Sequence, residues 1–179
     1  MATEAKLRQL ADKGCPVYYF YSSERYLVRQ AVTAITRILT ADSDEDATAL
    51  DGAAPEIEQL IMAAGTISFF GTRRVVVLPE IDPAAYSDKD LEELNSTLSS
   101  LENAVVVLGS VFELERSKLK TGKRAQKLIA QCKALGYTEE LAKPKPFELK
   151  MMMIDRAKEQ KTTLPDGAAA ALLERCGDC

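Results

Sequence analysis

Nucleophilic and metal-ligating side chains are scarce in this sequence, which limits the chemistry it can perform. The 179 residues include four cysteines and no histidine. Catalytic triads, HExxH zinc sites and histidine general bases are therefore excluded. Cys176-Gly-Asp-Cys179 has the spacing of a metal or redox motif, but a zinc site needs two further ligands, and Cys15 and Cys132 stand alone in the sequence. We therefore expect no metal centre and no cofactor.

Two segments invite comparison with phosphate-binding loops. Residues 22–30 follow a predicted strand, and Thr121-Gly-Lys-Arg124 contains a Gly-Lys pair. A phosphate loop needs glycines whose backbone N–H groups surround the phosphates, a lysine, and a Ser or Thr for magnesium. Residues 22–30 contain neither Gly nor Lys, and Arg124 stands where the Ser or Thr is needed. The sequence thus predicts a protein that is not a nucleotide-hydrolysing enzyme.

An aromatic pair, Phe69 and Phe70, lies in the connection between a predicted helix and a predicted strand. Because neighbouring side chains of a helix or strand point in different directions, at least one of the two rings should be partly exposed. An exposed aromatic pair beside two arginines can anchor a protein interface. The spacing alone leaves a second interpretation open, in which both rings cap the end of a sheet.

A basic amphipathic helix is predicted over residues 117–135. Lysines and arginines gather on one side of this segment, and apolar residues gather on the other. Such a helix suits phosphates or an acidic protein surface, although a solvated face would show the same pattern. The basic residues that could contact DNA or another partner are Arg116, Lys120, Lys123, Arg124 and Lys127.

The charges are divided unevenly along the chain, whose formal net charge is −4. Residues 1–110 hold 9 basic and 17 acidic side chains, a net of −8, and residues 111–179 hold 14 basic and 10 acidic, a net of +4. Nucleic acid and other charged partners can use such a polarity. No apolar run approaches the roughly 18 residues of a membrane span. The first residues also lack the apolar stretch of a signal peptide, so we expect a cytoplasmic protein with no membrane partner.

Short apolar strands alternate with amphipathic helices through residue 142. Continuous Val- and Tyr-rich runs are typical of buried parallel strands, and apolar residues at helical spacing predict the helices. The predicted strands are 17–21, 47–50, 74–78 and 104–108, and the helices are 3–13, 24–39, 55–64, 88–101 and 117–135. We expect Ser22 or Ser23 to cap the second helix and Ser87 to cap the fourth.

A proline-containing linker, residues 143–146, separates this pattern from two predicted helices, 147–161 and 165–175, that have no strand between them. The sequence therefore predicts an α/β domain with a parallel sheet over residues 1–142, followed by a small helical domain over residues 147–179.

Four segments, in this order, resemble the DNA polymerase III delta subunit family. Residues 18–27 are similar to the family's opening strand and turn, Tyr-Leu-Leu-Tyr-Gly-x-Glu-x-Tyr-Leu. Residues 68–76, Ser-Phe-Phe-Gly-Thr-Arg-Arg-Val-Val, resemble its Ser-Leu-Phe-x-x-Arg-Arg-Leu-Val segment. A strand followed by a basic helix comes third, and residues 154–177 look like the family's small helical lid domain.

The sequence also departs from the family's pattern. Ser22 stands where the family often has Gly, and Phe69 stands where Leu is common. The usual Asp-Lys-Arg-x-Lys pattern is only loosely met by Glu115-Arg-Ser-Lys118. The resemblance implies a clamp-loader ATPase-like parallel sheet, which is a P-loop NTPase-like fold without a P-loop, followed by a partial lid. The family's C-terminal collar domain has no counterpart in these residues.

The resemblance also implies a function and partners. Family members bind the ring-shaped sliding clamp, the beta subunit, and open it by inserting adjacent apolar residues into a clamp pocket. By residue match, these are Ile67, Phe69 and Phe70. Members act as non-catalytic parts of the DNA polymerase III holoenzyme, with the gamma/tau and delta prime subunits and primed DNA. The alternative is a nucleic-acid-binding α/β module that acts through the basic helix 116–127.

Overall fold

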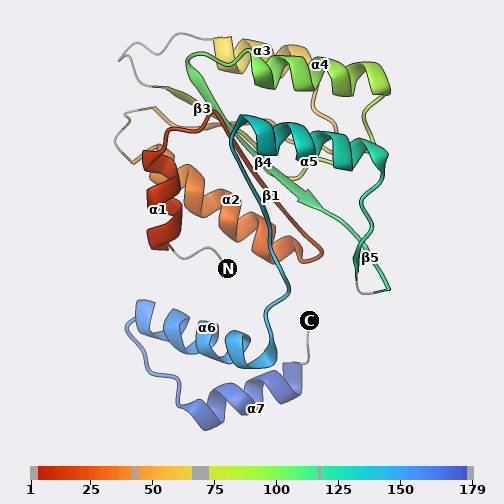
Figure 1. Ribbon diagram of the computed structural model, residues 1–179. Helices are drawn as coiled ribbons and strands as arrows, with labels where there is room; N and C mark the ends of the chain where they lie inside the picture. The colour runs from red at the N-terminus through yellow and green to blue at the C-terminus, as the bar shows by residue number, and fades with distance from the viewer. Residues whose placement is uncertain (1–3, 42, 44, 66–72, 117, 177–179) are drawn as a thin grey trace. The chain divides into compact units, whose positions relative to one another are not determined.

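Figure 1 shows a computed structural model of the chain. The described residues are 4–41, 43, 45–65, 73–116 and 118–176. The chain divides into two compact units, Met1–Ala142 and Lys143–Cys179. The first unit contains a parallel sheet with helices on both faces, and the second contains two helices. Within the described ranges, no helix is both long enough and apolar enough to cross a membrane.

A five-stranded parallel sheet forms the centre of the first unit. Its strands are β1 (Val17–Ser22), β2 (Thr48–Ala49), β3 (Arg74–Leu78), β4 (Ala104–Val111) and β7 (Tyr137–Glu140). Their spatial order is β2-β3-β4-β1-β7, and every neighbouring pair is parallel. The predicted α/β fold class is therefore confirmed. The sequence analysis missed β7, a polar edge strand that pairs with β1 alone.

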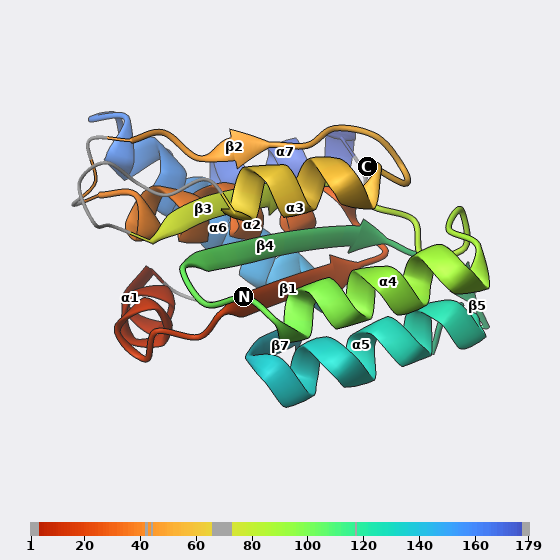
Figure 2. The ribbon, with the colours of Figure 1, turned by 90° about the horizontal axis from the view of Figure 1, so that it is seen from above.

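Helices cover both faces of this sheet. They are α1 (Glu4–Asp12), α2 (Arg25–Leu39), α3 (Ile57–Gly65), α4 (Asp88–Ser99) and α5 (Lys123–Leu135). Figure 2 shows α3, α4 and α5 on one side of the strands, and α1 and α2 pack on the other. Because successive side chains of a strand alternate between faces, Tyr18 and Phe20 of β1 pack with α1 and α2, whereas Val17 and Tyr19 pack with the other three helices. All four side chains are completely buried, which explains the continuous apolar run of this strand.

The start of α2 differs from the sequence-based prediction. Its N-cap residue is Glu24, with no side-chain capping bond. Ser22 is instead completely buried at the end of β1, where its Oγ donates a hydrogen bond to the carbonyl of Leu141 at 2.6 Å. That partner lies far away in the sequence, which is why local capping rules do not predict the contact. Ser87 does cap α4 as predicted, because its Oγ accepts from the backbone N of Asp90.

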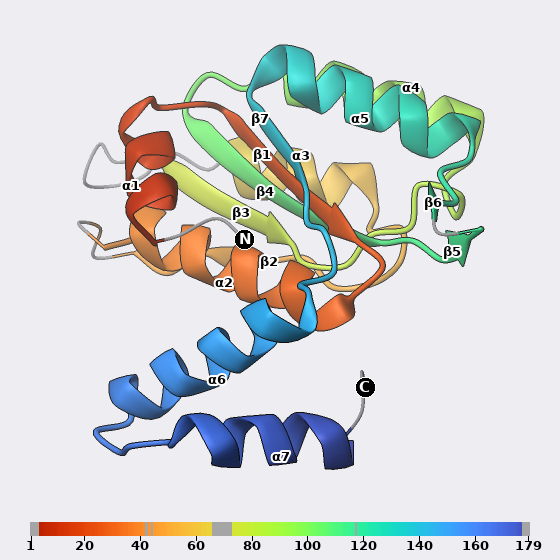
Figure 3. The same cartoon turned by 60° about the horizontal axis from the view of Figure 1, so that its bottom comes forward.

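The predicted helix 117–135 begins later than expected. Two short antiparallel strands, β5 (Leu114–Glu115) and β6 (Lys118–Leu119), precede it and form a hairpin. α5 begins only at Lys123, because Gly122 takes an extended backbone conformation with ψ 172° as its N-cap. Figure 3 shows the hairpin beyond the C-terminal end of β4, next to the N-terminal end of α5.

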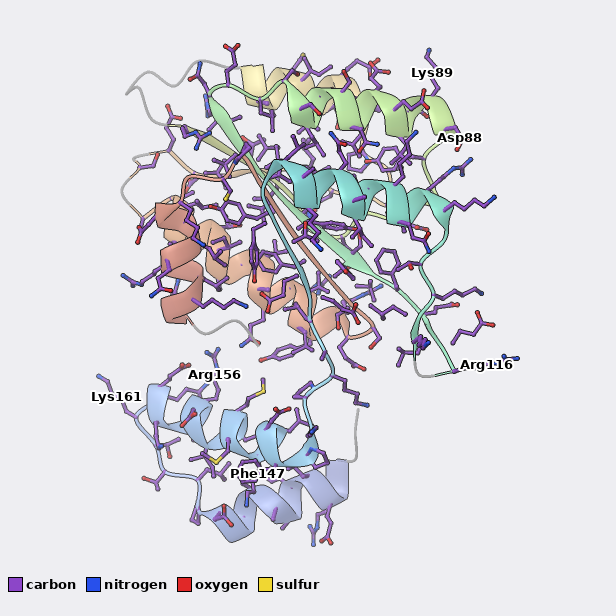
Figure 4. All side chains as sticks on the ribbon, in the orientation of Figure 1. Asp88, Lys89, Arg116, Phe147, Arg156 and Lys161 are labelled. Carbon is purple, nitrogen blue, oxygen red and sulfur yellow. The ribbon has the colours of Figure 1, made fainter. Side chains whose placement is uncertain are left out.

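The second unit consists of α6 (Pro146–Glu159) and α7 (Asp166–Cys176). The side chain of Glu148 accepts a hydrogen bond from the backbone N of Lys145 at 2.7 Å and so satisfies one donor at the start of α6. Ala169 is completely buried, whereas Phe147 is 67% exposed. Figure 4 shows Phe147 at the start of α6.

Candidate functional site

In parallel α/β sheets, ligands usually bind at the C-terminal ends of the strands. At this edge, β1 passes into α2 through only Ser23 and Glu24. The Oγ of Ser22 accepts a hydrogen bond from the backbone N of Glu24 at 3.1 Å while it donates to Leu141. Hydrogen bonds of the Ser22 hydroxyl therefore hold the turn in place. It contains neither the glycines nor the lysine with which a phosphate loop binds a nucleotide.

The loop that follows β3 also contacts this turn. Glu80 accepts from Arg25 at 2.6 Å, and its second carboxylate oxygen lies 3.7 Å from Arg29 Nη2. The two arginine side chains are 63% and 67% exposed and that of Glu80 is 30% exposed, so the ion pairs contribute little to stability. The side chain of Asp82, two residues further on, accepts from the backbone N of Ala84 at 2.9 Å. The polar side chains of this loop therefore join neighbouring segments of the first unit.

A buried chain of hydrogen bonds connects the loop after β3 to β1 and β4. Tyr19 donates from its hydroxyl to Ser110 Oγ at 2.8 Å, and Ser110 donates to the carbonyl of Ile81 at 2.8 Å. Both hydroxyl-bearing residues are completely buried, and burial raises the pKa of Tyr19 well above its ordinary value. Gly109 allows the loop to approach, because a Cβ atom there would lie 2.3 Å from the carbonyl oxygen of Pro79.

The predicted interface residues Ile67, Phe69 and Phe70 lie outside the residues that the structure describes. The elements on either side of them are well anchored. α3 packs on the sheet through Ile57 and Leu60, which are 5% and 1% exposed. β3 is hydrogen-bonded between β2 and β4. The chain therefore enters and leaves the segment 66–72 at fixed points of the fold.

Charged contacts also hold the residues that follow the segment, at the start of β3. Arg73 Nη1 donates to the carbonyl of Gly14 at 2.8 Å, and Arg74 Nη1 lies 3.3 Å from a carboxylate oxygen of Glu45. Arg74 is 23% exposed and Glu45 20% exposed at their side chains, so this pair is better shielded from solvent than the surface pairs. The two arginines of the family-like segment thus bind the body of the first unit.

Exposed apolar side chains occur on α3 immediately before the segment. Ile61 and Met62 are 46% and 69% exposed. They follow Leu60, which points into the core, and precede Gly65, the last residue of the helix. Large exposed apolar residues placed close together are typical of interaction surfaces. The sequence analysis did not identify this pair, because apolar residues in a helix are read as core residues from spacing alone.

The structure divides the five predicted basic contact residues. Lys123, Arg124 and Lys127 belong to α5, whereas Arg116 and Lys120 lie outside it. The prediction that all five share one helix face is therefore wrong. Arg116 occupies the turn of the hairpin with a φ of 50°, a left-handed conformation that no helix uses.

Two of the basic residues on α5 are paired with acidic residues of α4. Arg124 Nε donates to Asp88 at 2.7 Å, and Lys127 Nζ donates to Glu92 at 3.0 Å. The hydrogen bond from Arg124 lowers the pKa of the Asp88 carboxyl, and the same bond raises the pKa of Arg124. Arg124 also donates to the carbonyl of Ala84 at 3.1 Å. These two cations are therefore engaged within the first unit.

The cysteines form no recognisable centre in the described part of the chain. Cys132 is completely buried on α5, and burial raises the pKa of its thiol to about 12. The CxxC motif reaches from Cys176 to Cys179, and its last three residues lie outside the described ranges. Among described residues, no group of three or more His, Cys, Asp or Glu side chains could hold a metal ion.

The sheet order and the two-residue turn after β1 define the first unit as a P-loop NTPase-like α/β fold whose phosphate-loop position is a short turn without glycine. Comparison with known proteins then identifies the family. The sequence pattern described as DNA polymerase III, delta subunit, matches residues 18–135, and the chain belongs to this family. The match runs from β1 to the end of α5 and includes the segment 66–72.

One solved structure supports this fold. The Bacillus subtilis DNA clamp loader delta protein (YqeN) superposes with a TM-score of 0.60 and 23% sequence identity, over 96% of this chain and 52% of that chain. This chain therefore spans about half the length of that protein. A Walker-type ATPase of Pyrococcus abyssi superposes with a TM-score of 0.47 and 9% identity, over 97% of this chain and 63% of that one. No curated protein sequence matches significantly.

Proposed function

We propose that this chain binds a sliding clamp and stabilises an open form of the ring, as a subunit of a DNA polymerase III clamp loader. Ile67, Phe69 and Phe70 are the proposed contacts. The observation that carries the proposal is membership of the delta subunit family over residues 18–135, which include these three residues. The proposal also accounts for an aromatic pair in the connection between α3 and β3, two elements that are packed into the first unit.

The fold supports such a contact by holding both ends of the segment. α3 and β3 are packed into the first unit, so the elements on either side of the segment need little ordering when a partner binds. Ile61 and Met62, exposed in the middle of α3, would enlarge the apolar contact area. Burial of each large apolar side chain in a partner's pocket contributes roughly 1.5–3 kcal/mol, so the two aromatic rings together would contribute about 3–6 kcal/mol to the interface.

The proposed mechanism is thermodynamic rather than chemical. A protein that binds the open ring more tightly than the closed ring shifts the clamp toward the open form. No bond is made or broken in this step, so the chain acts as a non-catalytic subunit. The short, glycine-free turn after β1 supports this role. The gamma/tau and delta prime subunits and primed DNA are the proposed further partners within the loader.

The test is a Phe69→Ala/Phe70→Ala variant, measured for binding to the cognate clamp by calorimetry. We expect the dissociation constant to rise about thirtyfold or more, equivalent to about 2 kcal/mol. Phe147→Ala provides the matched control, since it removes a phenyl ring that is 67% exposed on α6 and far from the proposed contact in the sequence. Binding should be unchanged in that control. A double variant that unfolds, or that binds like the parent, would make the aromatic pair a structural cap.

A second candidate function is nucleic-acid binding by the basic residues around the start of α5. The specific observation in its favour is that Arg116, Lys120 and Lys123 make no ion pair with any described residue, unlike Arg124 and Lys127. Binding to DNA would be steeply dependent on salt, whereas binding through an apolar pair would not.

A further inference from the structure

We propose that the exposed side of α2 is a docking surface for an acidic surface of another protein. We call this surface the α2 stripe, and it consists of Arg25, Tyr26, Arg29, Thr33 and Arg37. All five residues are exposed. The stripe is separate from the proposed clamp contact, because α2 packs on one face of the sheet and α3 packs on the other.

The exposed and buried residues of α2 lie on different sides of the helix. Arg25, Arg29, Thr33 and Arg37 recur at intervals of four residues, so they follow one line along the helix, with Tyr26 beside them. The buried residues, which pack into the core, are Leu27, Val28, Ala31, Val32 and Ile35. At a rise of about 1.5 Å per residue, the stripe is about 16 Å long from Tyr26 to Arg37. This length is sufficient to contact one helix of a partner.

The residue types of the α2 stripe are those of a protein interface. All three basic residues of α2 are arginines, and the helix contains no lysine and no acidic residue. By contrast, three of the four basic residues of α5 are lysines. The aromatic residue Tyr26 is 63% exposed. Because tyrosine and arginine are enriched at interfaces and lysine is depleted there, the stripe differs from an ordinary solvated helix face.

An ion pair within the molecule shows that the stripe can bind a carboxylate. One oxygen of Glu80 lies 2.6 Å from Arg25 Nη2, and the other lies 3.7 Å from Arg29 Nη2. The second distance is too long for a hydrogen bond, and Arg29 makes none with any residue that the structure describes. A planar guanidinium can bind a carboxylate through two parallel hydrogen bonds. Arg29 therefore keeps this capacity for an Asp or Glu of a partner.

The charge of the stripe favours an acidic protein over a nucleic acid. The three arginines supply three positive charges, and Glu80 and the N-cap residue Glu24 supply two negative ones, which leaves a net charge of +1. A phosphate backbone is bound by many cations at once, and such binding requires no exposed aromatic ring. A protein surface with a few carboxylates and an apolar site for the Tyr26 ring fits the stripe better.

The test measures whether the whole 179-residue chain binds a defined acidic helix. A fluorescein-labelled helical peptide of about 18 residues, with glutamate at every fourth position, is titrated with the protein by anisotropy. A second peptide has glutamine at the same positions, and a labelled DNA duplex is titrated under the same conditions. The variant is Tyr26→Ala/Arg29→Gln. The matched control, Phe147→Ala/Lys133→Gln, also removes one exposed ring and one exposed cation.

We expect the parent chain to bind the glutamate peptide with a dissociation constant on the order of 100 μM, and the glutamine peptide about tenfold more weakly or less tightly still. The stripe variant should bind the glutamate peptide about tenfold more weakly than the parent, whereas the control should bind it like the parent. Arg29→Lys keeps the charge but loses the planar guanidinium, so it should weaken binding about threefold. This single variant also covers the case in which the double variant is poorly folded.

Three results would overturn the proposal. The first is no binding of the glutamate peptide at about 1 mM protein. The second is equal binding of the two peptides, or equal losses in the stripe variant and the control. The third is a loss of DNA binding in the stripe variant as large as its loss of peptide binding, because the stripe would then be a general surface for polyanions.

Discussion

Gly109 provides the most exacting test of how the edge of the sheet is built. It lies in β4, opposite Phe20 of β1, where the loop after β3 crosses closely. A Cβ atom at this position would lie 2.3 Å from the carbonyl oxygen of Pro79 and 2.8 Å from Cγ1 of Val28. The first neighbour is backbone, so the loop itself must move if Gly109 is replaced by Ala.

The expected cost follows from what that movement would disturb. Overpacking in a closed core costs about 1–3 kcal/mol. The backbone N of Ile81 donates to the carbonyl of Gly109 at 2.8 Å, and Ser110 Oγ donates to the carbonyl of Ile81 at 2.8 Å. Weakening two such bonds adds about 1 kcal/mol each. We therefore expect Gly109→Ala to lower the free energy of unfolding by about 3–5 kcal/mol.

Urea unfolding followed by far-UV circular dichroism measures this change. Gly122→Ala is the matched control, because a Cβ atom there meets no heavy atom within 4 Å and its φ of −68° suits any residue. The control should change stability by less than about 1 kcal/mol. If Gly109→Ala were as stable as Gly122→Ala, the close approach of the β3 exit loop to β4 would be refuted.

Two further predictions concern buried polar groups. Ser110→Ala should lower the free energy of unfolding by about 2–4 kcal/mol, because it leaves the hydroxyl of Tyr19 and the carbonyl of Ile81 without these partners. Tyr19→Phe should lower it by only about 1–2 kcal/mol. Equal losses of the two variants in urea unfolding would contradict this chain of hydrogen bonds. Burial raises the pKa of Cys132 from 9.0 to about 12, so the unfolded chain loses the thiol proton first and stability should fall as the pH rises between these values. Cys132→Ala should make that fall shallower, and an identical pH profile would remove the thiol as its cause.

The sequence was sufficient to predict the centre of the sheet. β1, β3 and β4 are largely continuous apolar runs because helices cover both faces of the sheet. The residue types alone therefore predict that these strands are buried. β7 was missed because it is an edge strand of sequence Tyr-Thr-Glu-Glu, with no apolar alternation. Its aromatic and β-branched residues after Gly136 were the available signal.

The positions of the basic residues 116–127 could not be predicted from the local sequence pattern alone. Cations from residue 116 to 127 fit a helical wheel, but Thr121 and Gly122 interrupt the helix and the preceding residues pair as a hairpin. The spacing of the lysines and arginines along the sequence does not depend on whether the segment is helical. That spacing therefore could not show that Lys123 belongs to the helix and Lys120 does not. The ion pairs to α4 depend on tertiary packing, and no spacing rule reveals them. The assignment of Ile67, Phe69 and Phe70 remains a prediction, which their chemistry and family membership motivate.

The most direct test of the proposed function is whether the 179-residue chain binds the cognate sliding clamp in solution. Isothermal titration of the clamp ring with the purified chain, at a salt concentration high enough to suppress non-specific charge contacts, measures this without any variant. We expect saturable binding with a dissociation constant in the micromolar range or tighter, as in specific interfaces in which a few buried residues carry most of the binding energy. The absence of any complex at about 100 μM of each protein, far above that range, would contradict the clamp-binding function.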